Sequence, residues 1–313
     1  MYPVVGGHPV YNASGTSQFI PEVWSSKLLV KFYSACVLTD ISNTEYEGEI
    51  RNMGDKVYIR TTPDITISNY SIGQNLTYQR PESPSTSLTI DKGKYFGFTC
   101  DDIVLHQTDI RLMDDWSNDA SYQMKIAVDV DVLTGMVGQS NASNLGNTAG
   151  RISGDYQLGA SAAPLQLTKD NIVDIIVDCR TVLEEQNIPT DDLWMVLPAW
   201  AVGRIKKSDL KDASLAGTAN SGNPVIRNGK IGRIDNFDIY SSNLLYSVTD
   251  SGTSGTCWYS FFGHKSALTF AAQLTKMESL RAESTFGDLI RGLNVYGYKV
   301  IKNAAMGELY ITK

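Results

Sequence analysis

The chain has 313 residues, of which 42% are hydrophobic and 19% charged, and its formal net charge is -7. This length can bury one large or two modest cores, and the many Gly, Ser, Thr and Asn residues favour β-structure with ordered loops over a helical bundle. The acidic balance argues against a general nucleic-acid binder, because phosphate contacts need clustered Lys and Arg. The densest basic cluster, Lys206-Lys207 with Arg204 and Lys211 nearby, is typical of a solvated helix end.

The four cysteines are isolated from one another, with no CxxC pair among Cys36, Cys100, Cys179 and Cys257. We therefore expect free thiols in a reducing compartment, with two disulfides as the less favoured alternative. The N-terminus has neither the positive region nor the apolar region of a signal peptide, and no window reaches the ~18 apolar residues of a membrane span. The sequence therefore predicts no membrane partner.

Residues 1–20 contain Gly, Ser and Pro and show no hydrophobic periodicity. We therefore expect an extended or mobile arm there. From Pro21, apolar residues recur at helical spacing, with Val23, Trp24 and Leu28 among them. Proline is favoured in the first turn of a helix. Residues 21–45 are therefore predicted to be a short helix and a connector.

An alternating pattern then begins, and Tyr46 to Arg60 is typical of two β-hairpin arms around a turn at Asn52-Met53-Gly54. The alternation continues beyond Arg60, and no helical segment occurs between Lys56 and Thr99 that could cover it. We therefore predict one long hairpin over residues 46–100. Its apolar side consists of Val57, Ile59, Ile65, Ile67, Leu88 and Ile90.

Such a hairpin needs cover from outside its own subunit. A strand from Lys56 to Tyr70 reaches roughly 50 Å at about 3.3 Å per residue, whereas a compact chain of this length has a radius of gyration near ~20 Å. An isolated two-stranded ribbon is marginal in water. The tip, about Asn69 to Ser87, is polar and carries few charges, Arg80 and Glu82. A neighbouring chain is the predicted cover, and a floppy loop in a monomer is the alternative.

The next segment, residues 101–163, predicts the longest element. Apolar residues recur at three- and four-residue steps, and Asp101 or Asp102 is a good N-cap. This indicates a helix of about 30 residues, or roughly 45 Å. Gly135 and Gly138 mark its end and could permit a bend, and the Gly/Ser/Asn-rich stretch that follows is typical of a surface loop.

Residues 164–273 mix helices with strands. The patterns predict a helix from Thr168 to just before Pro189, a fully apolar strand over 193–197 and a helix opened by Pro198. The patterns in residues 228–302 predict five further segments. These are a strand pair around a Gly turn in 228–242, a buried strand over 257–263, a short helix over 264–273, and two β-rich segments at 274–281 and 293–302.

The search for catalytic chemistry is largely negative. His8, His106 and His264 lie in different segments without second metal ligands, and no phosphate loop or nucleophile elbow is present. We therefore predict no catalytic, cofactor-binding or metal-binding residues. The alternative is a β-rich secreted or surface hydrolase that uses paired carboxylates. The candidate pairs, which are more typical of a solvated acidic stripe, are Asp101-Asp102, Asp114-Asp115 and Asp129/Asp131.

The order of these parts resembles the major capsid (coat) protein of tailed bacteriophages, the Hong Kong 97-like fold. Four local sequence segments also resemble coat proteins of this type: "YEGEIRNMGDKVYIR", "DKGKYFGFTCDDI", "VLPAW" and "FGDLIRGLNVYGYKVI". The resemblance covers nearly the whole chain and implies an α+β fold with peripheral and axial domains. The implied parts are an N-terminal arm (1–20), a short helix and connector (21–45), an extended β-hairpin loop (46–100), a spine helix and Gly/Ser-rich loop (101–163), an axial domain (164–273) and returning peripheral-domain strands (274–313).

The resemblance also implies a function. It implies a structural protein rather than an enzyme, without a cofactor, that self-assembles head to tail into pentamers and hexamers of an icosahedral head. The expected partners are many copies of the chain, a portal, and packaged double-stranded DNA held without sequence-specific binding. Only about twenty residues precede Pro21, so a separate scaffolding protein is expected in place of a fused segment. The expected location is the virion shell, assembled in the bacterial cytoplasm, with expansion on maturation left open.

Some members of this family crosslink a Lys of the extended loop to a neighbour, but Lys92 and Lys94 lie toward the base of this loop, so that chemistry is not expected here. Arg281 and Arg291 are hypothesised to form inter-subunit ion pairs around local symmetry axes. The full set of hypothesised inter-subunit contacts is Val57, Ile59, Ile65, Ile67, Tyr70, Arg80, Glu82, Arg281, Glu283 and Arg291.

Overall fold

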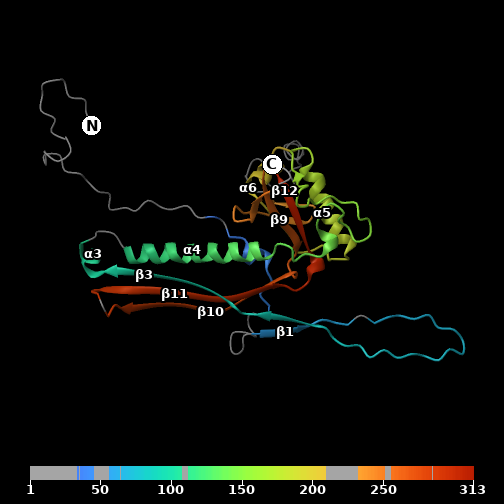
Figure 1. Cartoon of the computed structure of the whole chain (residues 1–313), viewed down its shortest axis with the longest axis horizontal. Helices are drawn as coiled ribbons and strands as arrows, with labels where there is room; N and C mark the ends of the chain where they lie inside the picture. Colours follow the sequence, from blue (N-terminus) through green and yellow to red (C-terminus); the bar gives the residue numbers. More distant parts are fainter. Residues whose placement is uncertain are drawn as a thin grey trace, which may run out of the picture.

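The structure is a computed structural model and has three parts: an elongated platform, a globular domain and a long ribbon (Figure 1). The predicted arm, the predicted helix after Pro21 and the predicted turn at Asn52–Gly54 lie outside the described residues. The structure describes residues 34, 36–45, 56–63, 65–107, 112–208, 232–250, 255–283 and 285–313.

The platform is a three-stranded antiparallel sheet in the order β10-β11-β3, with the long helix α4 lying along one face (Figure 1). Helix α4 has 24 residues and is therefore about 36 Å long. The platform consists of β3 (Lys92–Asp101), α3 (Asp102–Gln107), α4 (Leu112–Gly135), β10 (Leu268–Arg281) and β11 (Gly287–Val300).

Helix α4 packs on the sheet through side chains that alternate along β3. Phe98 meets Trp116 edge-on, with ring centroids 5.8 Å apart, and Cys100 on the same side of the strand is buried. The prediction of one continuous helix is wrong at its start, because α3 and α4 are separate helices. Residues 108–111 between them lie outside the described residues.

The globular domain is built on a seven-stranded mixed sheet in the order β4-β12-β9-β5-β7-β6, with β8 paired to β9. Its central strand β5 is buried at every residue, as the apolar run predicts. The strands are β4 (Leu165–Gln166), β5 (Leu193–Leu197), β6 (Arg233–Ile234), β7 (Phe237–Ser241), β8 (Ser247–Thr249), β9 (Thr256–His264) and β12 (Met306–Thr312).

Two helices, α5 (Ile172–Glu185) and α6 (Ala199–Ile205), confirm the helices predicted after Thr168 and Pro198. They share a hydrophobic core with one face of the seven-stranded sheet. A second core joins the sheet to the platform, and it includes α1 (Leu38–Ile41) and the C-terminal part of α4. Two short 3-10 helices complete the described elements, η1 (Ala142–Asn144) and η2 (Asn303–Ala305).

Strand pairing over long distances corrects three predictions. β3 belongs to the platform sheet rather than to the hairpin, because it pairs with β11 from Lys92↔Tyr296 to Asp101↔Gly287. The helix predicted over 264–273 is the end of β9 and the start of β10, because β10 pairs with β11 from Leu268 onward. The last strand, β12, lies between β4 and β9, so the segment 274–313 divides between the platform and the globular domain.

The strand pair predicted in 228–242 is β6 and β7, but its turn is not at a glycine. Asp235 and Asn236 occupy the turn with φ of 46° and 64°. Two consecutive residues with positive φ are typical of a type I′ hairpin turn, in which Asn and Asp are well tolerated. The four cysteines are free, as predicted. None of the helices in the described ranges is long and apolar enough to cross a membrane.

Candidate assembly surface

The ribbon begins as a regular hairpin and then loses its backbone pairing. Its base is β1 (Lys56–Arg60) paired antiparallel with β2 (Ser85–Thr89). Beyond the base, the Thr61 amide donates to the Pro84 carbonyl at 3.0 Å, and the Ser83 hydroxyl donates to the Thr61 carbonyl at 2.5 Å. Farther out, the Thr66 amide donates to the Gln79 side chain of the other arm at 3.1 Å. We call residues 61–84, without residue 64, the ribbon tip. Its described residues carry no strand assignment.

The ribbon tip exposes large apolar side chains. Six of them are each between 60% and 100% exposed in the isolated chain. Full burial of such a side chain is worth about 1.5–3 kcal/mol, so the tip has a large unused capacity for hydrophobic contact. The six side chains are Ile65, Ile67, Tyr70, Ile72, Leu76 and Tyr78.

The base of the ribbon, in contrast, is covered by its own subunit. Ile59, Leu88 and Ile90 are buried together with Ala271 of β10, and Val57 packs against this cluster. The prediction that the whole apolar side needs a neighbour is therefore wrong for Val57 and Ile59. It stays a prediction for Ile65, Ile67 and Tyr70.

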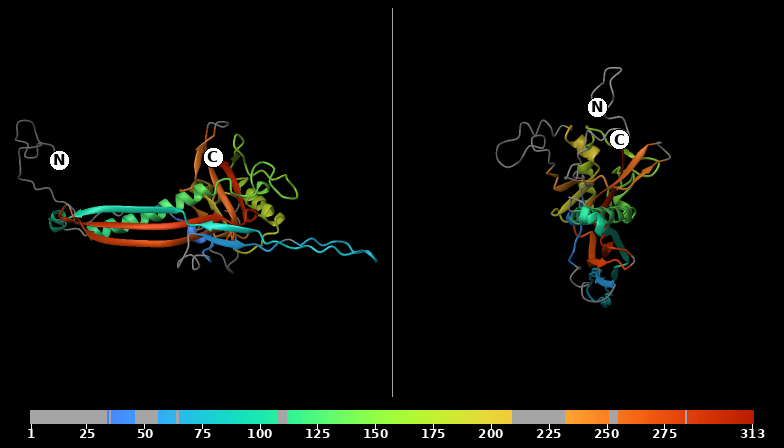
Figure 2. Two further views of the ribbon diagram at one scale, coloured as in Figure 1. Left: turned by 60° about the horizontal axis from the view of Figure 1, so that its bottom comes forward. Right: turned by 90° about the vertical axis from the view of Figure 1, so that its left-hand side faces the viewer.

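The ribbon base lies on the face of the platform sheet opposite to α4 (Figure 2). Side chains directly opposite each other in an antiparallel pair point to the same face. Val295 of β11 packs against the ribbon base, so the alternate residues Leu293 and Leu289 share its face. The register pairs Leu293 with Tyr95 and Leu289 with Leu280, which adds both partners to this face.

This face is covered near the ribbon base and bare toward α3. We define the outer face as Tyr95, Leu280, Leu289 and Leu293, whose exposed fractions run from 37% to 83%. In β11, exposed and buried residues alternate: Leu289 and Leu293 are exposed, whereas Ile290 and Gly292 between them are buried. This alternation is the sequence signal that could have identified the outer face. Sequence reasoning missed these four residues, because the part of the sheet face that remains uncovered depends on where the ribbon base packs. It also missed Ile72, Leu76 and Tyr78 on the ribbon tip.

A group of ion pairs crosses the outer face. The Arg291 guanidinium donates to the Glu278 carboxylate at 2.7 and 3.0 Å, and the Lys276 ammonium lies 2.6 Å from the same carboxylate. These bonds, first from Lys276 and then from Arg291, lower the pKa of Glu278 to about 2. The outer face therefore presents a mixed surface of apolar side chains around a cluster of two cations that share one carboxylate.

Arg281 is also paired within its own chain. Its guanidinium donates to Asp102 of α3 at 2.8 Å and to Asp288 of β11 at 3.2 Å. This hydrogen bonding lowers the pKa of Asp102. Both guanidinium groups thus already have partners within the subunit, and the hypothesis that Arg281 and Arg291 also serve inter-subunit ion pairs stays a prediction.

The charge reversal Arg281→Glu separates the two roles considered for this residue. We expect faster hydrogen exchange in α3, because the introduced carboxylate would repel Asp102 and Asp288, but an unchanged yield of assembled particles. Hydrogen exchange of the free chain and sedimentation of the assembled protein measure the two effects. A loss of particles with normal exchange in α3 would show instead that Arg281 pairs with a neighbour.

Three more of the hypothesised contact residues are exposed polar groups. Arg80 and Glu82 lie on the ribbon tip, and Glu283 lies in the turn between β10 and β11. The structure places the first two far from the third, at opposite ends of the elongated molecule (Figure 2). They do not form one site within a subunit.

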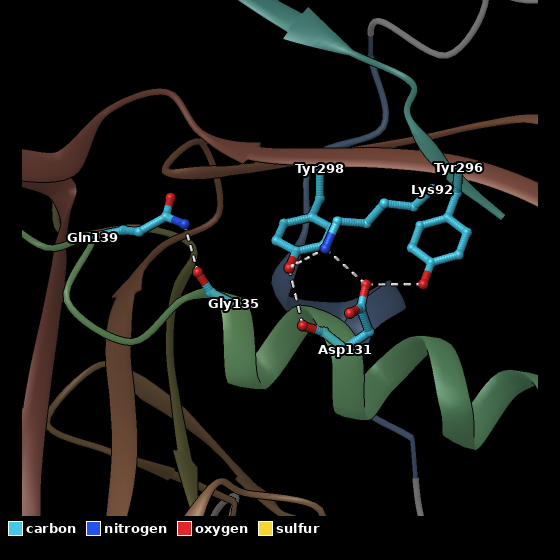
Figure 3. A network of polar contacts seen from close by, with 6 residues as sticks. All are labelled: Lys92, Asp131, Gly135, Gln139, Tyr296 and Tyr298. Carbon is cyan, nitrogen blue, oxygen red and sulfur yellow. Dashed lines mark hydrogen bonds and ion pairs between the residues drawn. The ribbon is translucent and has the colours of Figure 1, made fainter. Parts of the chain in front are cut away.

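The opposite face of the platform is fixed by a polar network between α4 and the sheet (Figure 3). Lys92 Nζ lies 3.1 Å from Asp131 Oδ2, and the Tyr296 hydroxyl donates to the same oxygen at 2.9 Å. The Tyr298 hydroxyl accepts from Lys92 at 3.0 Å and donates to the Asp131 carbonyl oxygen at 3.0 Å. The network therefore joins β3, β11 and α4.

The pKa shifts in the network reflect burial and these bonds. Burial alone would lower the pKa of Lys92, but its hydrogen bonds to Tyr298 and Asp131 raise the pKa above its usual value. Burial and the bond to Asp131 both raise the pKa of Tyr296. The neighbouring carboxylate Asp129 does not join Asp131, because it accepts hydrogen bonds from the Val37 and Leu38 amides instead. The Asp129/Asp131 pair is therefore not a two-carboxylate site.

Gly135 ends α4 at a point of close approach to Tyr298 (Figure 3). A Cβ on Gly135 would overlap the Tyr298 hydroxyl. Gly138, with φ of 73°, adopts the left-handed conformation that follows many helices. The glycine at 135 is thus required by packing, which gives a reason for it other than the bend suggested by the sequence.

The substitution Gly135→Ala will lower the free energy of unfolding by about 1–3 kcal/mol, the usual cost of overpacking, because Tyr298 must leave its bond to Asp131. Gly203→Ala in α6 is the control, since a Cβ there meets no atom within 4 Å. Urea unfolding monitored by circular dichroism gives both values. Equal stability of the two variants would contradict the role assigned to Gly135.

Comparisons with known proteins identify the fold. No protein-family model matches the sequence, and no curated protein matches it either. The structure is similar to a chain of Mycobacterium phage Che8, with 24% identity and a TM-score of 0.73 over 93% of this chain and 97% of that one. It is also similar to a chain in the capsid of Cyanophage P-SCSP1u, with 13% identity and a TM-score of 0.70 over 94% of both chains.

A chain of the bacteriophage PhiM1 mature capsid gives the same result, with 13% identity and a TM-score of 0.66 over 97% of this chain and 95% of that one. The fold is therefore an α+β capsid fold. The likeness runs over almost the whole length of each solved chain, so this chain has the fold of phage capsid proteins. The predicted resemblance is confirmed at this level.

Proposed function

We propose that the chain is the major capsid protein of a tailed bacteriophage with a Hong Kong 97-like fold. In this proposal it assembles through head-to-tail contacts into pentamers and hexamers of an icosahedral shell that encloses double-stranded DNA. The observation that carries the proposal is the ribbon tip, whose six large apolar side chains lack cover in the single chain. Its place is the virion, and a portal and a scaffolding protein remain expectations from the resemblance.

The subunit offers two bare surfaces, which lie toward opposite ends of its long axis. The ribbon tip projects from one end of the molecule, and the outer face lies on the platform that extends toward the other end (Figure 2). Each arm of the tip has roughly a dozen residues and reaches about 40 Å, which is enough to span the bare half of the 14-residue strand β11, roughly 23 Å long. The dimensions support a contact in which one subunit's tip lies along the next subunit's outer face.

The position of the ribbon base supports the same contact. Within one subunit, the base already packs on the covered half of this sheet face, through Val295 and Ala271. A neighbour's tip on the bare half would continue that layer. The contact joins two different surfaces, and heterologous contacts of this kind close into rings when the rotation allows. Several weak contacts per subunit then act together in a shell.

The remaining features agree with a container. The net charge of -7 gives no electrostatic attraction to packaged DNA. The Asp129/Asp131 pair gives no support to the alternative of a hydrolase with paired carboxylates, since the two side chains engage different partners.

Electron microscopy and sedimentation velocity of the purified full chain test the proposal. We expect closed particles, or rings of five and six subunits, at micromolar concentration. A protein that stays monomeric under all assembly conditions would contradict the proposal. A hydrolytic activity of that monomer, lost on replacement of a carboxylate pair, would establish the alternative.

A further inference from the structure

Residues 36–43 form a short segment, here called the strap, that lies where the platform meets the globular domain. Its apolar side chains Val37, Leu38 and Ile41 are all less than 9% exposed. They share a core with residues of α4, of β10 and of the seven-stranded sheet, including Val132, Leu268 and Phe261. The strap therefore contacts both the platform and the globular domain where they meet.

The first end of the strap is held by a side chain from α4. The Val37 amide donates to Asp129 Oδ2 at 3.2 Å, and the Leu38 amide donates to Asp129 Oδ1 at 3.0 Å. Asp129 is only 1% exposed, and this burial raises its pKa although the two amides oppose the shift. Both carboxylate oxygens are thus committed to a segment about ninety positions earlier in the chain.

The second end of the strap is held by β10. The Asn43 amide donates to the Leu268 carbonyl at 2.8 Å, and the Phe270 amide donates to the Asn43 carbonyl at 3.0 Å. These bonds form a parallel bridge between Asn43 and Thr269. The two ends of the strap are therefore attached to different elements of the platform, the first to α4 and the second to β10.

The four-residue helix α1 within the strap is too short to be stable by itself. Its N-cap Val37 has no side-chain cap of its own. Asp129 supplies the missing acceptors from another element, and it can do so only when α4 stands beside the strap. The strap can therefore adopt this position only when α4 places Asp129 next to the Val37 and Leu38 amides.

We propose that the strap is a clasp that fixes the angle between the platform and the globular domain, and that Asp129 is the positioning residue that seats it. The effect on shell geometry rests on the proposed function, whereas the seating itself belongs to the single chain. Since ring and shell curvature depend on the shape of each subunit, a loosened clasp would change the size distribution of particles.

The test compares Asp129→Asn and Asp129→Ala with the control Asp115→Asn, an exposed carboxylate on the same helix. Asparagine replaces one carboxylate oxygen with an NH2 group, which donates and cannot accept, so one of the two strap amides loses its partner, and alanine removes both acceptors. In the unassembled chain we expect hydrogen exchange in residues 36–43 to rise about tenfold in Asp129→Asn and more in Asp129→Ala, because buried amides lose a charged acceptor. Exchange in α5 should stay unchanged, and Asp115→Asn should match the parent chain throughout.

Unchanged exchange in the strap, or an equal rise in α5, would overturn the seating role. If Asp129→Ala fails to fold, the comparison of Asp129→Asn with Asp115→Asn still decides. Electron microscopy of particles from Asp129→Asn should show a broader range of diameters than the parent protein. A released strap with particles of parental size would overturn the angle-fixing role while leaving the proposed function intact.

Discussion

The triple substitution Ile67→Ser, Ile72→Ser and Tyr78→Ser in the ribbon tip will prevent particle formation while leaving the subunit folded. These side chains are 88%, 100% and 89% exposed, so their loss should change the free energy of unfolding by no more than about 0.5 kcal/mol each. In an assembled contact each would remove about 1.5–3 kcal/mol of burial. In the proposed shell every subunit makes this contact, so the losses would combine across the particle.

Sedimentation velocity and urea unfolding measure the two effects on the same preparations. The matched control carries Asn75→Ser and Thr77→Ser, which change exposed polar residues of the same loop. We expect normal particles from the control and slowly sedimenting folded chains from the triple variant. A normal particle yield from the triple variant would show that the apolar side chains of the tip do not hold the shell together.

The substitution Leu88→Ala at the ribbon base will have the opposite pattern. Leu88 is fully buried between the ribbon and the platform sheet, so we expect a loss of about 2–5 kcal/mol in the free energy of unfolding. Tyr58→Ala is the control from the neighbouring strand, because its ring is 68% exposed and its removal should cost little.

Hydrogen exchange locates the effect of Leu88→Ala. We expect faster exchange in residues 85–90 and in the facing part of β11, where Lys299 Nζ donates to the Ser87 carbonyl at 3.1 Å. Similar stabilities of the Leu88→Ala and Tyr58→Ala variants would mean that the base is not anchored on its own sheet. Together, the tip and base variants separate assembly energy from folding energy along one ribbon.

Local patterns in the sequence predicted much of the fold. The fully apolar run over 193–197 is the central strand β5, and the helical period after Thr168 is α5. The alternation around Val57 and Ile59 is β1, and the two β-rich segments near the end of the chain are β10 and β11. Strand β5 is buried at every residue and appears as a continuous apolar run, whereas helix α5 buries one face and shows the helical period, so each local pattern predicts its element.

The remaining elements were not predicted correctly, because they depend on pairing between strands that lie far apart in the sequence. β3 looks like the return arm of a hairpin, yet its partner is β11, almost two hundred residues later. The segment 264–273 has an ambiguous pattern that pairing with β11 resolves as strand. The candidate surface was predicted where side chains project beyond the subunit, at Ile65, Ile67 and Tyr70, and was wrong at Val57 and Ile59, which their own sheet covers.

Charge pairs were the least predictable part of the surface. Arg281 and Arg291 were expected to reach across subunits because the sequence shows only alternating signs. Antiparallel register places Glu278 directly opposite Arg291 and Asp288 directly opposite Arg281, which satisfies both guanidinium groups locally. The sequence carries no local sign of that register.

A cryo-electron microscopy map of the assembled particle tests the central claim most directly. The expected density places the ribbon tip of one subunit, residues 61–84, along the outer face of the adjacent subunit, over Tyr95, Leu280, Leu289 and Leu293. A map in which the tip lies on its own subunit, or points into solvent above a bare sheet face, would contradict the head-to-tail contact.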